Sequence, residues 1–252
     1  MATEMFCSNF SDTVKSLIKS VIRRTLLMYV IHKIRKEANK CFNIEDYVSL
    51  SYDFHLRLKL PLIRGIFRIS PIQINEEIAQ LLNLLAELKP KTLLEIGTAN
   101  GGTLFLFCQV AEPDATIISI DLPGGPFGGG YPEWRIPLYK SFAKERQRIH
   151  LIRGNSHDLC TLREVMSILD GKIDFLFIDG DHAYEGVKKD FEMYSPLVRK
   201  GGIIAFHDIV PGPPERVGGV PRFWSEVKHS YEFREIVKDW NQNGYGIGVI
   251  YV

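Results

Sequence analysis

Acidic and imidazole side chains follow two hydrophobic segments of the sequence, 173–178 and 203–206. These side chains are Asp179, Asp181, His182, His207 and Asp208. If both segments are neighbouring parallel strands, their carboxyl ends meet at the edge of the sheet where open α/β folds bind ligands. Carboxylate oxygens suit Mg²⁺ or Ca²⁺, and an added imidazole also suits Mn²⁺, Fe²⁺ or Zn²⁺. The pattern therefore indicates a polar site that either holds a divalent ion or uses an imidazole as a general base.

A glycine-rich turn follows an earlier hydrophobic segment, 92–96. Its glycines are Gly97, Gly101 and Gly102. Glycine permits a positive φ and a close approach of the backbone to a ligand, and the helix after such a turn directs free N–H groups at that ligand. Asp121 ends the next hydrophobic segment, at the position where a carboxylate accepts hydrogen bonds from ribose hydroxyls. These features predict a nucleotide-like ligand.

The spacing of the glycines distinguishes between cofactors. A dinucleotide-binding turn would read GxGxxG, whereas Glu95 here precedes Gly97 by two residues and the next glycine is Gly101. An acid at that place repels a phosphate and attracts a cationic amino-acid group. Asn155 and Ser156 follow the segment 149–153 and could reach an adenine edge.

The stretch 72–252 resembles the class I S-adenosylmethionine-dependent methyltransferases. The resemblance implies that the cofactor S-adenosyl-L-methionine contacts the glycine turn with its methionine portion, the ribose binds Asp121, and the adenine lies near Asn155 and Ser156. The cofactor-binding residues expected on this basis are Glu95, Gly97, Thr98, Gly101, Gly102, Asp121, Asn155, Ser156 and Asp179.

The two acidic segment ends resemble those of small-molecule O-methyltransferases. In the catechol type, three oxygen ligands for a metal come from these two places, and Asp179 matches the first. His207 and Asp208 stand where that type has Asp-Asn and where macrocin-type and cephalosporin-hydroxylase-like proteins have Glu-Asp. The resemblance implies a Mg²⁺ or other divalent-cation site at Asp179, His207 and Asp208. For catalysis it leaves two routes open, a metal that lowers the pKa of the hydroxyl or a base, with His182, Asp179 and His207 as the expected catalytic residues.

The elements that must position these residues alternate along the chain. Strands are expected at 92–96, 116–121, 149–153, 173–179, 203–207, 233–237 and 245–252. Helices are expected from Asn75 to Leu88 and at 102–111, 133–147, 159–169 and 185–198. Only 239–244 separates the final pair of strands, which is too short for a parallel crossover and requires an antiparallel hairpin.

The expected fold is therefore α/β, with a Rossmann-like, seven-stranded, mostly parallel sheet that has an antiparallel C-terminal hairpin. Residues 1–70 form a helical N-terminal extension and residues 71–252 the methyltransferase domain. An amphipathic helix is expected at 13–40, where eight basic side chains outnumber three acidic ones between residues 1 and 40. It packs on its own domain or on a second subunit, or else contacts an anionic membrane surface.

Two loops are expected to frame the mouth of the site. The segment 123–131 would be a lid that brings Phe127 and Tyr131 to the acceptor, and the segment 211–224 would offer Arg216, Arg222 and Trp224. The alternative is that both are surface loops without ligand contacts.

Composition limits the class of protein. Of 252 residues, 24% are charged and the formal net charge is +1, so no global field recruits nucleic acid. Scattered cysteines, and the lack of an apolar run of ~20 residues, predict a cytoplasmic protein without a transmembrane segment, and we expect a homo-oligomer.

The expected function is methyl transfer to a hydroxyl of a small molecule, either a sugar or a natural-product-like acceptor. The alternative is a non-catalytic S-adenosylmethionine-binding partner or sensor of the same fold.

Overall fold

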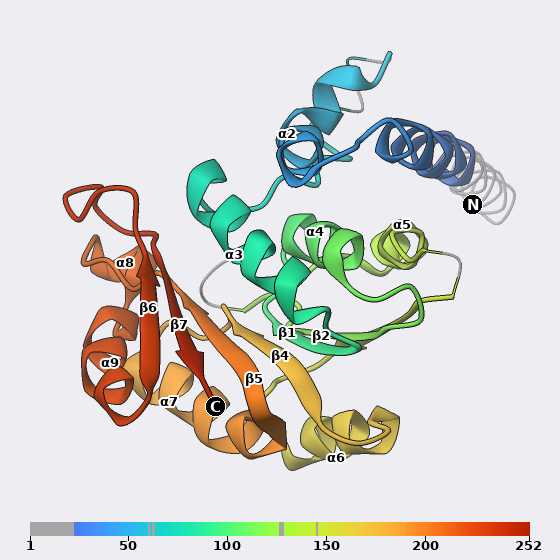
Figure 1. Cartoon of the computed structure of the whole chain (residues 1–252). Helices are drawn as coiled ribbons and strands as arrows, with labels where there is room; N and C mark the ends of the chain where they lie inside the picture. The colour runs from blue at the N-terminus through green and yellow to red at the C-terminus, as the bar shows by residue number, and fades with distance from the viewer. Residues whose placement is uncertain (1–22, 60, 62–63, 126–128, 145) are drawn as a thin grey trace, which may run out of the picture.

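A seven-stranded sheet forms the centre of the protein (Figure 1). The computed structural model describes residues 23–252 except 60, 62–63, 126–128 and 145. The strands are β1 (Thr92–Ile96), β2 (Thr116–Asp121), β3 (Arg148–Arg153), β4 (Ile173–Ile178), β5 (Val198–His207), β6 (Glu232–Ile236) and β7 (Ile247–Tyr251). Their order is β3-β2-β1-β4-β5-β7-β6. The first five strands are parallel, and β7 is antiparallel to both β5 and β6. The expected fold class is thus confirmed.

Helices cover both faces of the sheet (Figure 1). On one face lie α2 (Ile44–Asp53), α3 (Asn75–Leu88), α4 (Gly102–Val110) and α5 (Ile136–Lys140), and on the other lie α6 (Leu159–Ile168), α7 (Tyr184–Tyr194) and α9 (Val220–Val227). Side chains alternate across the strands, so Phe175 and Phe177 of β4 pack under α4 while Leu176 and Ile178 pack against the opposite helices. Each face therefore has its own hydrophobic core.

The sheet contains a switch point between β1 and β4. After β1 the chain continues outward to β2 and then β3, whereas β4 lies on the other side of β1. Backbone pairing brings the two strand ends together, because Ile96 pairs with Ile178 and the Asp179 N–H donates to the Ile96 carbonyl at 2.8 Å. Ligands of open α/β sheets bind at such a point.

The N-terminal region packs on the same face as α4. Residues 23–38 are helical, and the part of the expected 13–40 helix before residue 23 lies outside the described residues. Leu27, Val30 and Ile34 are buried in the core cluster that also contains Phe105 of α4. The division of the chain at residue 70 stays a prediction.

Two expected helices are shorter in the structure. The 133–147 segment forms the 3₁₀ helix η3 (Glu133–Arg135) and α5, and then turns, with the Gln147 amide donating to the carbonyls of Cys108 and Glu112 at 3.0 Å each. The 185–198 segment ends as α7 at Tyr194, because Pro196 lies in a 3₁₀ turn that leads directly into β5. Among the described residues, no helix is long and apolar enough to cross a membrane.

Candidate functional site

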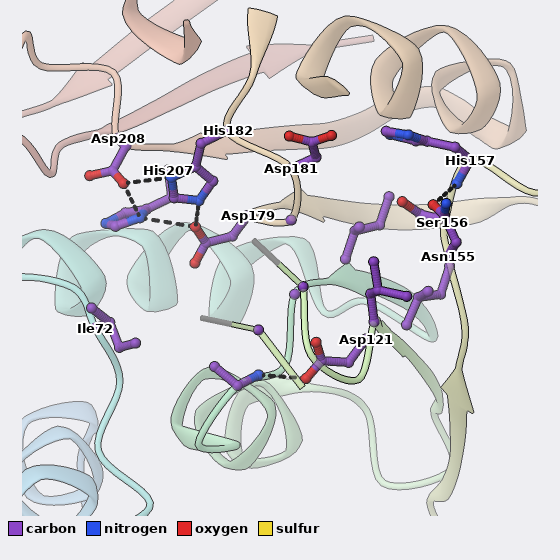
Figure 2. Close-up of a pocket in the computed structure, with 18 of the residues that line it drawn as sticks. Ile72, Asp121, Asn155, Ser156, His157, Asp179, Asp181, His182, His207 and Asp208 are labelled. Atoms are coloured by element: carbon purple, nitrogen blue, oxygen red, sulfur yellow. Dashed lines mark hydrogen bonds and ion pairs between the residues drawn. The ribbon is translucent and has the colours of Figure 1, made fainter. Parts of the chain in front are cut away.

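A cavity of about 240 Å³ opens at the carboxyl ends of the parallel strands. Figure 2 shows three groups around it, which are Asp121 after β2, the segment from Asn155 to His157 after β3, and the acid–imidazole cluster after β4 and β5. Sequence segments far apart in the chain therefore contribute to one concave site, as expected for this edge of the sheet.

Asp121 lies on the cavity wall with its carboxylate held by the backbone. Its Oδ2 accepts a hydrogen bond from the Ala99 N–H at 2.9 Å, and its Oδ1 accepts one from the Gly130 N–H, also at 2.9 Å. Burial raises the pKa of Asp121 to about 6, although these backbone N–H groups act in the opposite direction. The carboxylate is thus oriented, and at neutral pH it is ionised.

The glycines of the turn are required mainly by the protein's own packing. Gly97 lines the cavity with φ +98°, and a Cβ there would lie 1.9 Å from the Asp179 carbonyl oxygen, so no larger residue fits between the ends of β1 and β4. Gly101 faces the Tyr139 ring, where a Cβ would lie at 2.7 Å, and a Cβ on Gly102 would be 2.2 Å from the Pro71 nitrogen. Gly101 and Gly102 do not line the cavity.

Glu95 and Thr98, both expected in the cofactor-binding set, do not line the cavity. Strand alternation turns Glu95 toward α4, where it is 1% exposed and accepts hydrogen bonds from the hydroxyls of Thr103 and Ser119. Thr98 is also buried and shares a hydrogen bond with the Ser119 hydroxyl. Burial raises the pKa of Glu95 to about 8, so this carboxyl is protonated at neutral pH.

The residues after β3 line the opposite side of the cavity from the acid–imidazole cluster (Figure 2). Asn155 accepts a hydrogen bond from the His157 N–H at 2.9 Å, and the Ser156 carbonyl accepts one from the Tyr194 hydroxyl at 2.7 Å. His157 also lines the cavity. Its Nε2 lies 3.3 Å from Oδ1 of the fully buried Asp190, and this contact raises the pKa of His157.

Asp179, His182, His207 and Asp208 form the acid–imidazole cluster (Figure 2). The Asp179 Oδ1 is 3.3 Å from His182 Nε2 and 3.1 Å from His207 Nδ1, and Asp208 Oδ2 is 3.4 Å from His182 Nδ1. Asp181 points elsewhere, because its Oδ1 accepts the Ala183 N–H at the start of α7. The structure thus brings together every residue expected to be catalytic or to bind a metal.

The charges of the cluster are strongly coupled. Burial alone would raise the pKa of Asp179, but the adjacent His207 and His182 hold it well below its usual range. Burial would likewise lower the pKa of His182, yet its contact with Asp179 raises it to about 9. With this pKa His182 is protonated at neutral pH, and binding of a metal ion to its ring would release the proton.

The donor atoms of the cluster fit a divalent ion. One ligand atom from each of Asp179, His182 and Asp208 lies within 4.8 Å of the other two. Two carboxylates and one imidazole form a donor set that suits Mn²⁺, Fe²⁺ or Zn²⁺ as well as Mg²⁺. His207, also expected as a ligand, lines the cavity as well and is 3% exposed, with its Nδ1 toward Asp179. Its buried Nε2 has no hydrogen-bond partner among the described residues.

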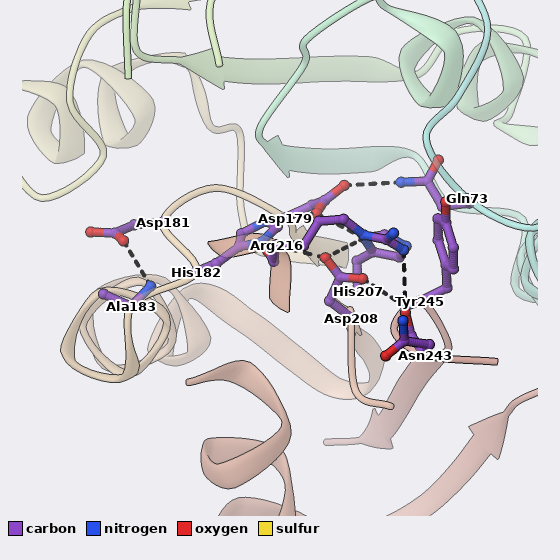
Figure 3. A network of polar contacts seen from close by, with 10 residues as sticks. All are labelled: Gln73, Asp179, Asp181, His182, Ala183, His207, Asp208, Arg216, Asn243 and Tyr245. Atoms are coloured by element: carbon purple, nitrogen blue, oxygen red, sulfur yellow. Dashed lines mark hydrogen bonds and ion pairs between the residues drawn. The ribbon is translucent and has the colours of Figure 1, made fainter. Parts of the chain in front are cut away.

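The loops that frame the mouth differ in part from expectation. Arg216 lines the cavity, and its guanidinium carbon lies 4.4 Å from the centre of the Tyr245 ring (Figure 3). Trp224 is instead a core residue of α9, and Arg222 lies on the surface beside Glu226. Tyr131 is buried, with its ring packed on Tyr139, and Phe127 lies outside the described residues.

Two residues contact the cluster although no sequence pattern indicates them. Gln73, ahead of α3, donates from Nε2 to Asp179 Oδ2 at 2.9 Å, and the Tyr245 N–H donates to Asp208 Oδ1 at 2.8 Å (Figure 3). Neither residue follows a parallel strand. No local pattern marks them, because tertiary packing alone brings their segments to the strand ends.

Part of the chain is similar to known proteins. Residues 94–209 match the family model described as a methyltransferase domain. The uncharacterized protein R132 of Acanthamoeba polyphaga mimivirus is 36% identical over 118 residues, which are 46% of this chain and 51% of that protein. The uncharacterized protein y4gI of Sinorhizobium fredii is 30% identical over 148 residues, 57% of this chain and 16% of that protein. The chain thus spans about half the length of one relative and far less of the other.

Solved structures share the fold at low sequence identity. The O-methyltransferase TomG from Streptomyces achromogenes, in complex with S-adenosylmethionine, has a TM-score of 0.54 and 17% identity, covering 82% of this chain and 89% of that chain. An O-methyltransferase from Bacillus cereus in complex with S-adenosylhomocysteine has a TM-score of 0.53 at 17% identity, with coverage of 82% and 90%. CalS11, a TDP-rhamnose 3'-O-methyltransferase, has a TM-score of 0.52 at 16% identity, with coverage of 82% and 93%.

Proposed function

We propose that the protein transfers a methyl group from S-adenosylmethionine to a hydroxyl oxygen of a small molecule. The premise is that the chain carries a methyltransferase domain of the class I S-adenosylmethionine-dependent type. One observation carries the proposal. A single cavity joins Asp121 and Gly97 to the acid–imidazole cluster, so a nucleoside held at one end would present its methyl group at the other.

The cofactor would bind along the ends of β1, β2 and β3. Asp121, ionised at neutral pH and fixed by two backbone N–H groups, would accept hydrogen bonds from the ribose hydroxyls. Asn155 and Ser156 line the place proposed for the adenine. The methionine portion would lie beside Gly97, where a residue without a Cβ allows the ends of β1 and β4 to lie close together.

Methyl transfer requires the acceptor oxygen to meet the sulfonium methyl carbon in line, and the hydroxyl to lose its proton. The C–O bond forms as the S–CH₃ bond breaks, and S-adenosylhomocysteine leaves with the electron pair on sulfur. Alignment by the cavity walls accounts for much of the acceleration in such a reaction. Asp179 and Asp208 are the carboxylates closest to the imidazoles, and we propose that the reacting hydroxyl binds beside them.

We propose that Asp179, His182 and Asp208 hold a divalent ion, which would lower the pKa of a coordinated hydroxyl. His182 would lose its proton on binding the ion, because only the neutral imidazole is a metal ligand, and the coordinated ring nitrogen could not also act as a general base. His207 would then orient Asp179 from below through the 3.1 Å contact of its Nδ1.

The acceptor would be a sugar or a natural-product-like molecule. Arg216 and the Tyr245 ring offer a charged and an aromatic surface at the acceptor end of the cavity, and Ile72 adds an apolar one. One structure of the same fold is a TDP-rhamnose 3'-O-methyltransferase, which supports a polyhydroxylated acceptor. We further propose a cytoplasmic homo-oligomer, and light scattering on the purified protein would test its assembly.

Calorimetry with S-adenosylhomocysteine tests the proposal. Binding near micromolar affinity that is lost in Asp121→Ala is expected, and unchanged affinity in that variant would refute the ribose role. Methyl transfer to a panel of hydroxylated acceptors should be suppressed by EDTA and restored by Mg²⁺ or Mn²⁺. Indifference to EDTA would refute the metal assignment, and cofactor binding without any turnover would favour a sensor protein.

A further inference from the structure

The loop between β6 and β7, residues 237–246, brings Tyr245 to the cavity in an unusual backbone conformation. Four successive residues, Asn243 to Gly246, have positive φ angles of 63°, 111°, 63° and 79°. This conformation is unfavourable for residues that carry a Cβ, and it persists only where the surrounding structure fixes it. Some group outside the loop must therefore hold the segment in place.

One such group is Glu77, in the first turn of α3 and fully buried. Its Oε1 accepts hydrogen bonds from the Lys238 N–H at 3.0 Å and from Gln242 Nε2 at 2.8 Å, and its Oε2 accepts one from the Gly246 N–H at 3.0 Å. One carboxylate thus binds the beginning, the middle and the end of the loop. Three donors also compensate for the loss of hydration that burial of a carboxylate entails.

The far side of the loop is attached to the acid–imidazole cluster. The Tyr245 N–H donates to Asp208 Oδ1 at 2.8 Å, and the Tyr245 carbonyl accepts the Val210 N–H at 3.0 Å (Figure 3). Asp208 itself has φ +59°, and its other oxygen faces His182 at 3.4 Å. A continuous series of hydrogen bonds therefore runs from Glu77 through the loop backbone to Asp208.

We infer that Glu77 is a positioning residue that sets the orientation of Asp208 and Tyr245 by fixing the backbone of this loop. Glu77 does not line the cavity, so it acts on Asp208 through the loop, which it holds at Lys238, Gln242 and Gly246 and which contacts Asp208 by the Tyr245 N–H. The inference rests on the proposed function in that Asp208 is taken as part of a metal site. Partners that orient metal ligands in this way typically change metal affinity by about 10- to 100-fold when they are removed.

The test compares Glu77→Gln with Glu76→Gln. The amide introduced by Glu77→Gln would offer one acceptor oxygen and direct an NH₂ group at an N–H donor. Glu76 is the adjacent, exposed acid, whose Oε1 accepts a hydrogen bond from the Lys238 side chain of the same loop at 2.6 Å. Amide hydrogen exchange at Tyr245 is measured by NMR, and Mn²⁺ affinity by electron paramagnetic resonance of the free ion. The affinity for S-adenosylhomocysteine shows whether the cofactor end of the cavity is intact in each variant.

In Glu77→Gln we expect exchange of the Tyr245 amide to accelerate at least about tenfold and Mn²⁺ to bind about tenfold more weakly, with S-adenosylhomocysteine affinity within about twofold of the wild type. Glu76→Gln should change none of these. A lower melting temperature with unchanged Tyr245 exchange and unchanged Mn²⁺ affinity would overturn the inference, since Glu77 would then only stabilise the fold.

A second variant covers the case in which Glu77→Gln does not fold. Gln242→Ala removes one of the three donors from the edge of the loop, and about threefold faster Tyr245 exchange is expected, in keeping with the loss of one hydrogen bond. Unchanged exchange would overturn the inference. If the wild type binds no Mn²⁺, the metal part of the proposed function fails, whereas Tyr245 exchange in the two variants still decides the role of Glu77.

Discussion

Replacement of Glu95 by Gln should remove a pH dependence of stability that the wild type carries. Glu95 is buried against α4, and burial raises its pKa from 4.5 to about 8. The unfolded chain therefore ionises this carboxyl at a pH where the folded protein keeps it protonated. Because unfolding releases a proton, the free energy of unfolding falls as pH rises from about 4.5 to about 8. The amide of Gln does not titrate, so the variant lacks this contribution.

The magnitude follows from proton linkage. With pKa values of 4.5 and about 8 for the unfolded and folded states, integration between pH 5 and pH 8 gives a loss of about 3.5 kcal/mol in the wild type. Urea denaturation of both proteins at pH 5, 6, 7 and 8 measures the effect. The stability of Glu95→Gln relative to the wild type should rise by about this amount across the series.

Two comparisons make the test specific. Glu87→Gln makes the same chemical change at an exposed position of α3 and is the matched control. S-adenosylhomocysteine should bind Glu95→Gln within about twofold of the wild type, because the Glu95 carboxyl does not face the cavity. Stability curves for wild type and variant that stay parallel from pH 5 to pH 8 would refute the assignment of a buried, protonated Glu95.

Three further outcomes are expected. Because burial raises the pKa of Asp121 to about 6, the affinity of the wild type for S-adenosylhomocysteine, measured by calorimetry, should fall about tenfold from pH 7 to pH 5. The Asp121→Asn variant should bind S-adenosylhomocysteine weakly at both pH values. A wild-type affinity that does not change with pH would contradict this prediction. In Gly97→Ala the added Cβ would lie 1.9 Å from the Asp179 carbonyl oxygen, so the free energy of unfolding in denaturant should fall by about 3 kcal/mol or more. Gly171 has φ +107° and open space around it, so Gly171→Ala should lower the free energy of unfolding by only about 1–2 kcal/mol. Equal losses would show that backbone conformation, and not the contact with β4, requires glycine at position 97. Asp208→Asn should weaken Mn²⁺ binding at least about tenfold without changing S-adenosylhomocysteine affinity, and unaltered Mn²⁺ binding would place the ion elsewhere.

The sequence predicted well those features that depend on short, repeating patterns. Hydrophobic segments followed by acids located the parallel strands, and chain order then placed Asp121, Asp179 and Asp208 at one edge of the sheet, where the structure also has them. The short connection before β7 correctly required an antiparallel pair. These features follow from strand periodicity and from the geometry of crossover connections.

Side-chain direction and long-range contacts were not predictable in the same way. The place of Glu95 before Gly97 predicts a contact with the cofactor, whereas the alternation of β1 turns this side chain to the α4 face, where Thr103 and Ser119 provide hydrogen bonds. Glu77 contacts residues more than 160 positions later in the chain, and no local pattern reports such a contact. The sequence of α3, which contains Glu77, predicts only an ordinary amphipathic helix.

The strand order also affects how the chain folds during synthesis. In the described sheet β6 pairs with β7 alone, and β7 lies between β5 and β6 although it follows both in the sequence. While the ribosome makes the chain, β6 emerges first and remains without a hydrogen-bonding partner, and the edge of β5 stays open beside it. A nascent chain stalled before residue 247 would thus expose two unpaired strand edges, a state that chaperones recognise and that is prone to aggregation.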